Sequence, residues 1–118
     1  MAKHLIDLSY LKNISMGSND FELKLLKTFV EQTTIEMEKI REFLQKKDWN
    51  SLCASAHKIK PSFHFIGGLE AETLLTSMED ITRHKTNLGK LPELVGTFLQ
   101  ACKKTIGDVK IEIEKYKR

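Results

Sequence analysis

Residues 56–68, AHKIKPSFHFIGG, decide which fold we expect for this chain. Apolar side chains recur in this stretch at helical spacing, and the glycine pair at its end is typical of a helix terminus. His57 stands off the apolar stripe, between an alanine and a lysine, and Pro61 follows four residues later. The pattern predicts an amphipathic helix that displays one imidazole to solvent.

A helical wheel at about 100° per residue places His57 about 140° from the centre of the apolar face, so we expect its side chain to be exposed. Lys60 lies one turn further along the same helix, on the side nearer the core, whereas Lys58 points away. Asp48 is a suitable N-cap for this helix. The residues expected to face the core are Leu52, Ala56, Ile59, Phe63 and Ile66.

The two glycines also predict a partner for His57. If the chain reverses at Gly67 and Gly68, residues equidistant from the turn lie side by side, and His57 and Glu79 are each eleven residues from Gly68. Both would then lie about 16 Å from the turn. A carboxylate there can accept a hydrogen bond from one imidazole nitrogen and leave the other as a nucleophile.

Outside this hairpin, the sequence pattern of the rest of the chain also predicts helices. Asn19 and Glu22 have capping-box spacing, and apolar residues follow at helical spacing from Phe21 to Leu44. Pro92 suits the first turn of a last helix that ends near residue 116. With short connections, these segments predict an all-α fold: an up-and-down antiparallel four-helix bundle over about 19–117 and a short extra helix over about 7–14. We expect one domain over residues 1–118.

Composition excludes several classes of function. The 118 residues are 41% hydrophobic and 30% charged, which is ordinary for a soluble domain. With no apolar run near 18 residues and no signal peptide, we expect no membrane insertion and a cytoplasmic location. The net charge of +3 is spread along the helices, which argues against nucleic-acid binding. Cys53 and Cys102 are too few for a disulfide framework and fit free thiols.

The central stretch resembles the signature of histidine-containing phosphotransfer (HPt) domains, the small helical bundles of multistep His–Asp phosphorelays. That signature runs Ala-His-x-Leu/Ile-Lys-Gly-Ser, with a glycine ten residues after the histidine and often Gln or Glu twenty-two residues after it. Glu79 occupies the last of these places. The likeness spans roughly residues 7–115, although only the histidine motif is specific. The matching positions in the motif are Ala56, His57, Ile59, Lys60, Ser62 and Gly67.

The resemblance implies a function and a role for each motif residue. His57 would accept a phosphoryl group from a receiver-domain aspartate and pass it to another, with Lys60 offsetting the phosphate charge and Glu79 orienting the ring. The receivers of response regulators or hybrid kinases would supply the Mg²⁺, so we expect a monomeric phosphocarrier without a cofactor and not an enzyme. Compact side chains would keep the approach to the imidazole clear, namely Ala56, Pro61 and Gly67.

Two positions depart from the family pattern. Pro61 replaces the usual glycine, although a Lys-Pro-Ser-Phe version also belongs to the family, and a proline in a helix removes a backbone donor. His64 stands where a small residue is common, so it would either crowd a docking partner or add a donor to the phosphate.

Two alternative functions remain open on the sequence. Cys53, His57 and His64 lie on one stripe at spacings of four and seven residues, which is compatible with a weak metal site; the two histidines are about 10 Å apart along the helix. The second alternative is a helical adaptor that docks receivers without transfer.

Overall fold

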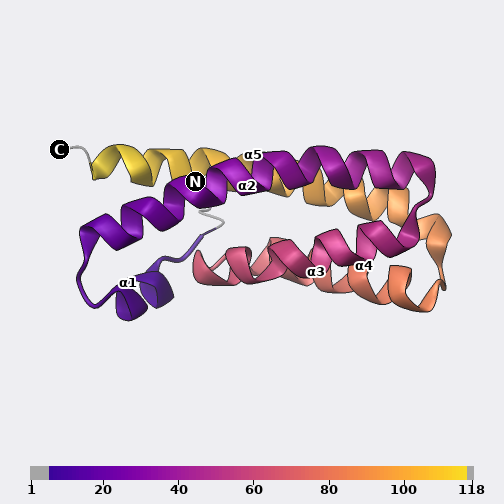
Figure 1. The fold of residues 1–118 in the computed structure, drawn as a ribbon, viewed down its shortest axis with the longest axis horizontal. Helices are drawn as coiled ribbons and strands as arrows, with labels where there is room; N and C mark the ends of the chain where they lie inside the picture. The colour runs from indigo at the N-terminus through magenta and orange to yellow at the C-terminus, as the bar shows by residue number, and fades with distance from the viewer. Residues whose placement is uncertain (1–5, 117–118) are drawn as a thin grey trace.

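The structure is a computed structural model and describes residues 6–116. Every regular element in this range is helical (Figure 1). The helices are α1 (Ser9–Ser15), α2 (Asn19–Lys46), α3 (Trp49–Phe65), α4 (Leu69–His84), a short 3₁₀ turn η1 (Leu88–Lys90), and α5 (Leu91–Lys115).

The four long helices form a closed antiparallel bundle. Each of α2, α3 and α4 packs against the next helix in the chain, and α5 returns to pack against α2. In Figure 1 the longer helices α2 and α5 run together along one side of the molecule, with the shorter hairpin of α3 and α4 beneath them. The predicted up-and-down four-helix bundle with a short extra helix is confirmed.

Aromatic contacts join the helices at the centre of the core. The ring of Phe63, on α3, is fully buried and packs edge to face against Phe29 of α2, with ring centroids 5.0 Å apart. On its other side it meets Phe98 of α5 at 5.9 Å. Because three helices converge on this ring, the orientation of α3 is fixed about its own axis.

The inward line of α2 differs from the predicted stripe at its beginning. Phe21 is 44% exposed, whereas Leu26 and Glu22 are buried. Counting back from Phe29 by three and by seven residues gives Leu26 and Glu22, so Phe21 falls about 100° to the side of this line. The apolar pattern alone did not reveal that a carboxylate occupies the inner face here.

The N-cap of α2 is also one residue earlier than predicted. The Ser18 hydroxyl accepts a hydrogen bond from the Phe21 amide at 3.2 Å, so Ser18 caps the helix in place of Asn19. The expected capping box does not form, because the Glu22 carboxylate turns inward to other partners. The predicted N-cap Asp48 is confirmed by its hydrogen bond from the Ser51 amide at 3.2 Å.

Helix α1 covers the end where α2 and α5 extend beyond the α3–α4 hairpin (Figure 1). The longer helices exceed the shorter pair by roughly 15 Å, which leaves a length of apolar surface to cover. Leu11 of α1 is fully buried in this gap. Buried Glu22 links three helices there, since it accepts hydrogen bonds from the Ser15 hydroxyl of α1 and, at 2.6 Å, from the Tyr116 hydroxyl at the end of α5.

Gly67 makes the turn between α3 and α4 and touches the N-terminal segment. Its φ of +67° is a left-handed conformation that L side chains rarely adopt. A Cβ built on it would lie 2.2 Å from the backbone oxygen of Asp7. The Asp7 amide donates to the Ile66 carbonyl at 2.9 Å, so this contact ties the segment before α1 to the hairpin.

We expect Gly67→Ala to lower the free energy of unfolding by about 2 kcal/mol or more, through backbone strain and the clash with Asp7. Chemical denaturation measures this. The matched control is Gly96→Ala in α5, where a Cβ meets nothing within 4 Å and helix propensity favours alanine by up to about 1 kcal/mol. Equal stability of the two variants would contradict the assigned role of the turn.

We expect the contribution of Glu22 to stability to depend on pH. Hydrogen bonds from Ser15 and Tyr116 hold the pKa of Glu22 below its ordinary value of 4.5. A depressed folded-state pKa stabilises the fold above pH 4.5, and this stability is lost as the pH falls through the folded-state value. Glu22→Gln should therefore have a free energy of unfolding about 1–3 kcal/mol lower than that of the wild type at pH 7. Urea denaturation measures this difference, and it should be smaller at pH 3. A difference in free energy of unfolding that does not change with pH would refute this explanation.

Candidate functional site

His57 lies on the outer face of α3, and its side chain is 70% exposed. Its Nδ1 atom is 3.2 Å from Oε2 of Glu79 on α4. Within residues 6–116, no hydrogen-bond partner contacts the other ring nitrogen, Nε2. The imidazole is therefore held on one side by the neighbouring helix and open to solvent on the other.

Glu79 is a buried charge, only 3% exposed. Burial alone would raise its pKa, but contacts with Lys60 and His57 outweigh this and hold the pKa below the ordinary value. The side chain is therefore a carboxylate near neutral pH and can only accept hydrogen bonds. It follows that in the neutral ring Nδ1 of His57 carries the proton and Nε2 has the lone pair.

Lys60 is the cation beside this pair. Its Nζ atom lies 2.8 Å from Oε1 of Glu79, and its side chain is 28% exposed. The contact is an ion pair and not a well-aligned hydrogen bond, because this oxygen has no partner of standard hydrogen-bond geometry among residues 6–116. Lys58 points away from the site, as the helical wheel indicated. It lies 3.4 Å from buried Glu36 on α2, an ion pair that the wheel did not predict.

Arg83 is a site residue that the sequence analysis missed. Its Nη2 atom donates to Oε2 of Glu79 at 2.8 Å, the same oxygen that accepts from His57. The hairpin register predicts the position of Arg83. Arg83 and Cys53 are equidistant from Gly68, so Arg83 lies beside Cys53, one helical turn further from the hairpin turn than His57. The spacing of four residues from Glu79 on one helix face also predicts this contact.

The surface around the imidazole is shallow. His57 and Arg83 border an open hollow of about 360 Å³ whose other lining residues are Asn50, Cys53, Ala54 and Thr82. Such a surface does not enclose a small substrate. It leaves the imidazole within reach of a second protein.

The sequence matches the family model described as "Hpt domain" over residues 24–110. The chain belongs to the Hpt domain family. This confirms the resemblance inferred from the histidine motif. As an Hpt domain, the protein is a histidine-containing phosphotransfer intermediate of two-component signalling, and domains of this family interact with the receiver domains of response regulators and hybrid kinases.

Two solved structures share the fold of this Hpt domain. Histidine-containing phosphotransfer protein B (HptB) from Pseudomonas aeruginosa PAO1 superposes with a TM-score of 0.86 at 22% identity, covering 98% of this chain and 99% of the other. The HPT domain of the Hpt sensor hybrid histidine kinase from Shewanella gives a TM-score of 0.83 at 18% identity, with coverages of 95% and 96%. No curated protein matches the chain significantly. No helix within residues 6–116 is long and apolar enough to cross a membrane.

Several residues expected to support the site of this Hpt domain have other surroundings. Ala56 is fully buried in the core, as the helical wheel predicted, and Gly67 is constrained by the turn and by Asp7, so neither borders the approach to the imidazole. Ser62 faces a groove between α2 and α3, because five residues rotate it about 140° from His57. Pro61 is exposed, and α3 continues through it to Phe65.

His64 lies on the same side of α3, but it has its own partners. Its Nδ1 atom is 3.2 Å from Oε2 of Glu72 on α4, and its ring packs edge to face against Tyr10 of α1 with centroids 5.1 Å apart. The side chain is still 58% exposed. His64 therefore belongs to the α1 end of the hairpin, and no contact joins it to His57 within the described residues.

The described part of the chain does not assemble the alternative metal site. It contains no group of three His, Cys, Asp or Glu side chains that could hold a metal ion. Cys53 is half-buried, and its Sγ atom contacts the backbone oxygen of Glu79 at 3.7 Å. Burial raises the pKa of Cys102 to about 12, so this thiol stays protonated in the core.

We expect nuclear magnetic resonance to find His57 protonated on Nδ1 and bare on Nε2 when the ring is neutral. The ¹⁵N chemical shifts of the two ring nitrogens distinguish the tautomers. Replacing Glu79 with alanine removes the only acceptor at Nδ1 in the described structure and should abolish this bias, while His64 keeps its own pattern as an internal control. A neutral wild-type ring protonated on Nε2 would contradict the assigned geometry.

Proposed function

We propose that His57 is the phosphoacceptor of this Hpt domain and that Nε2 is the atom that forms the bond to phosphorus. The observation that carries the proposal is an exposed ring whose Nδ1 is held by a buried carboxylate and whose Nε2 has no partner in the described part of the chain. A nucleophile needs its lone pair free and its ring fixed in orientation, and Glu79 provides both.

The transfer step needs little chemistry from this chain. As Nε2 attacks, a bond forms from nitrogen to phosphorus, the bond from phosphorus to the receiver's aspartate oxygen breaks, and the aspartate leaves as a carboxylate. The imidazole then carries positive charge, since Nδ1 keeps its proton. The Glu79 carboxylate stabilises that charge, as an orienting acid does in a catalytic triad.

Lys60 stabilises the product through charge. A phosphoryl group adds nearly two negative charges at pH 7. The Lys60 ammonium lies one helical turn from His57 and is held on Oε1 of Glu79, so its charge is already beside the ring before transfer. A preorganised charge of this kind lowers the free energy of a developing anion without reorganisation.

The partner supplies the remaining groups. We propose that a receiver domain brings its phosphoaspartate and a bound Mg²⁺, which neutralises charge on the transferring group, and that this Hpt domain acts as a phosphocarrier with no cofactor of its own. Reversal of the same step passes the group to a second receiver. The shallow surface around His57 suits such an exchange, because two proteins must contact it in turn.

We expect ³²P from a panel of phosphorylated receiver domains with Mg²⁺ to label the wild type as an acid-labile, base-stable phosphate. His57→Gln should take up no label and should keep its helical circular dichroism. The matched control is His64→Gln, which changes another exposed histidine on α3 whose Nδ1 also contacts a carboxylate, and it should be labelled like the wild type. Label on His57→Gln would refute the assignment. Absence of label on every variant while the receivers still bind would point to a docking-only adaptor.

A further inference from the structure

Two cations, not one, are fixed beside His57. We propose that Arg83 binds the phosphoryl group on His57 together with Lys60, an inference that rests on the proposed function of His57. Both cations contact the same buried carboxylate, with Lys60 Nζ 2.8 Å from Oε1 and Arg83 Nη2 2.8 Å from Oε2 of Glu79.

The two cationic residues lie at different backbone levels, one on each side of His57 along the bundle axis. Lys60 is three residues from His57 in the direction of the hairpin turn, about 4.5 Å along the helix. Arg83 is at the level of Cys53, four residues from His57 in the other direction, about 6 Å along the helix. The contact of Cys53 with the backbone oxygen of Glu79 supports this register between α3 and α4. A phosphoryl group on Nε2 would therefore have one cation on each side.

Charge and exposure indicate that Arg83 can bind an anion in addition to Glu79. Glu79 carries one negative charge and contacts two cations, so the site has one excess positive charge before a phosphoryl group arrives. The Arg83 side chain is 54% exposed and borders the open hollow with His57. Its contact with Glu79 uses one terminal nitrogen, and the planar guanidinium offers further donors in the fork geometry that matches phosphate oxygens.

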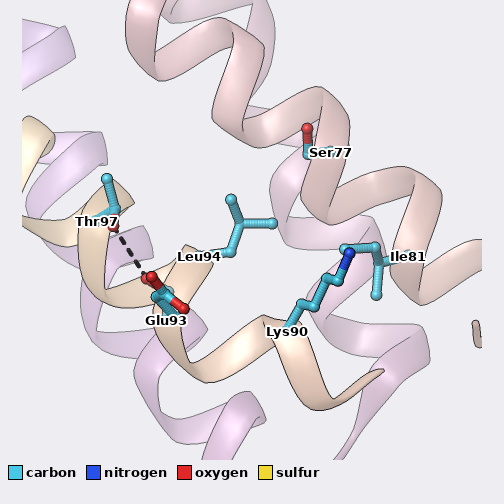
Figure 2. Close-up of a pocket in the computed structure, with 6 residues that line it drawn as sticks. All are labelled: Ser77, Ile81, Lys90, Glu93, Leu94 and Thr97. Carbon is cyan, nitrogen blue, oxygen red and sulfur yellow. Dashed lines mark hydrogen bonds between the residues drawn. The ribbon is translucent and has the colours of Figure 1, made fainter. Parts of the chain in front are cut away.

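A second hollow that contains a cation does not compete for this role. The hollow between α4 and α5 is lined by Ser77, Ile81, Lys90, Glu93, Leu94 and Thr97 (Figure 2). Its lining contains no histidine and it opens on a different face of α4 from Glu79, because Ser77 and Glu79 are about 160° apart around the helix. Arg83, in contrast, shares its hollow with the reactive ring.

The test is the equilibrium constant for phosphoryl transfer from a receiver that labels the wild type. Arg83→Gln should shift this equilibrium toward the receiver by roughly threefold to tenfold, with partial rescue in Arg83→Lys. The matched control is Arg41→Gln on α2, which removes another partly exposed arginine that pairs with a glutamate at 2.7 Å. It should transfer like the wild type. Lys60→Ala provides the comparison for the first cation.

The ¹⁵N shifts of unphosphorylated His57 separate direct binding from an indirect effect. If Arg83 binds the phosphoryl group, Arg83→Gln keeps the Nδ1–H tautomer and only the transfer equilibrium moves. An altered tautomer with an altered equilibrium would overturn the proposal in favour of a residue that only positions Glu79. Equal equilibria for Arg83→Gln and Arg41→Gln would also overturn it. Failure of the proposed function looks different, since then the wild type itself takes up no label on His57.

Discussion

The site depends on one buried carboxylate placed at the seam between two helices. Glu79 is almost inaccessible to solvent, yet it remains ionised because Lys60 and His57, across the seam on α3, contact its oxygens and lower its pKa. An isolated buried charge would cost several kcal/mol, so the contacts with Lys60, His57 and Arg83 are what make this position tolerable. The same contacts fix the tautomer of the ring and hold positive charge around it. The stability of this seam and the orientation of His57 thus depend on the same carboxylate.

The carboxylate can perform this role only if the α3–α4 hairpin keeps its register. A shift of one residue would rotate Glu79 by about 100° and remove it from the imidazole. The glycine turn sets the start of α4, and Phe63, packed between aromatic rings of α2 and α5, fixes the rotation of α3. Gly67 also contacts Asp7, so the segment before α1 supports the turn that aligns the site. Parts of the chain far from His57 therefore determine its geometry.

Buried carboxylates recur in this bundle as links between helices. Glu22 links α1, α2 and α5, and Glu36 joins α2 to α3 through the Ser55 hydroxyl at 2.6 Å. Burial would raise the pKa of Glu36, but Ser55 and nearby lysines lower it overall. Glu22 and Glu36 are covered by hydrogen-bonded neighbours, whereas Glu79 has an exposed imidazole as its partner. That difference separates a structural acid from one that can orient a nucleophile.

The sequence by itself determined the all-α bundle, the exposed position of His57 and its pairing with Glu79. Helical periodicity and a glycine turn are local signals, and a two-helix hairpin has a register that can be counted from its turn. Only the tertiary structure decided that Glu79 is buried and that Arg83 and His57 share one of its oxygens. These properties depend on which neighbouring helix covers each face. Packing between elements distant in sequence sets that choice, and the pattern within one helix does not encode it.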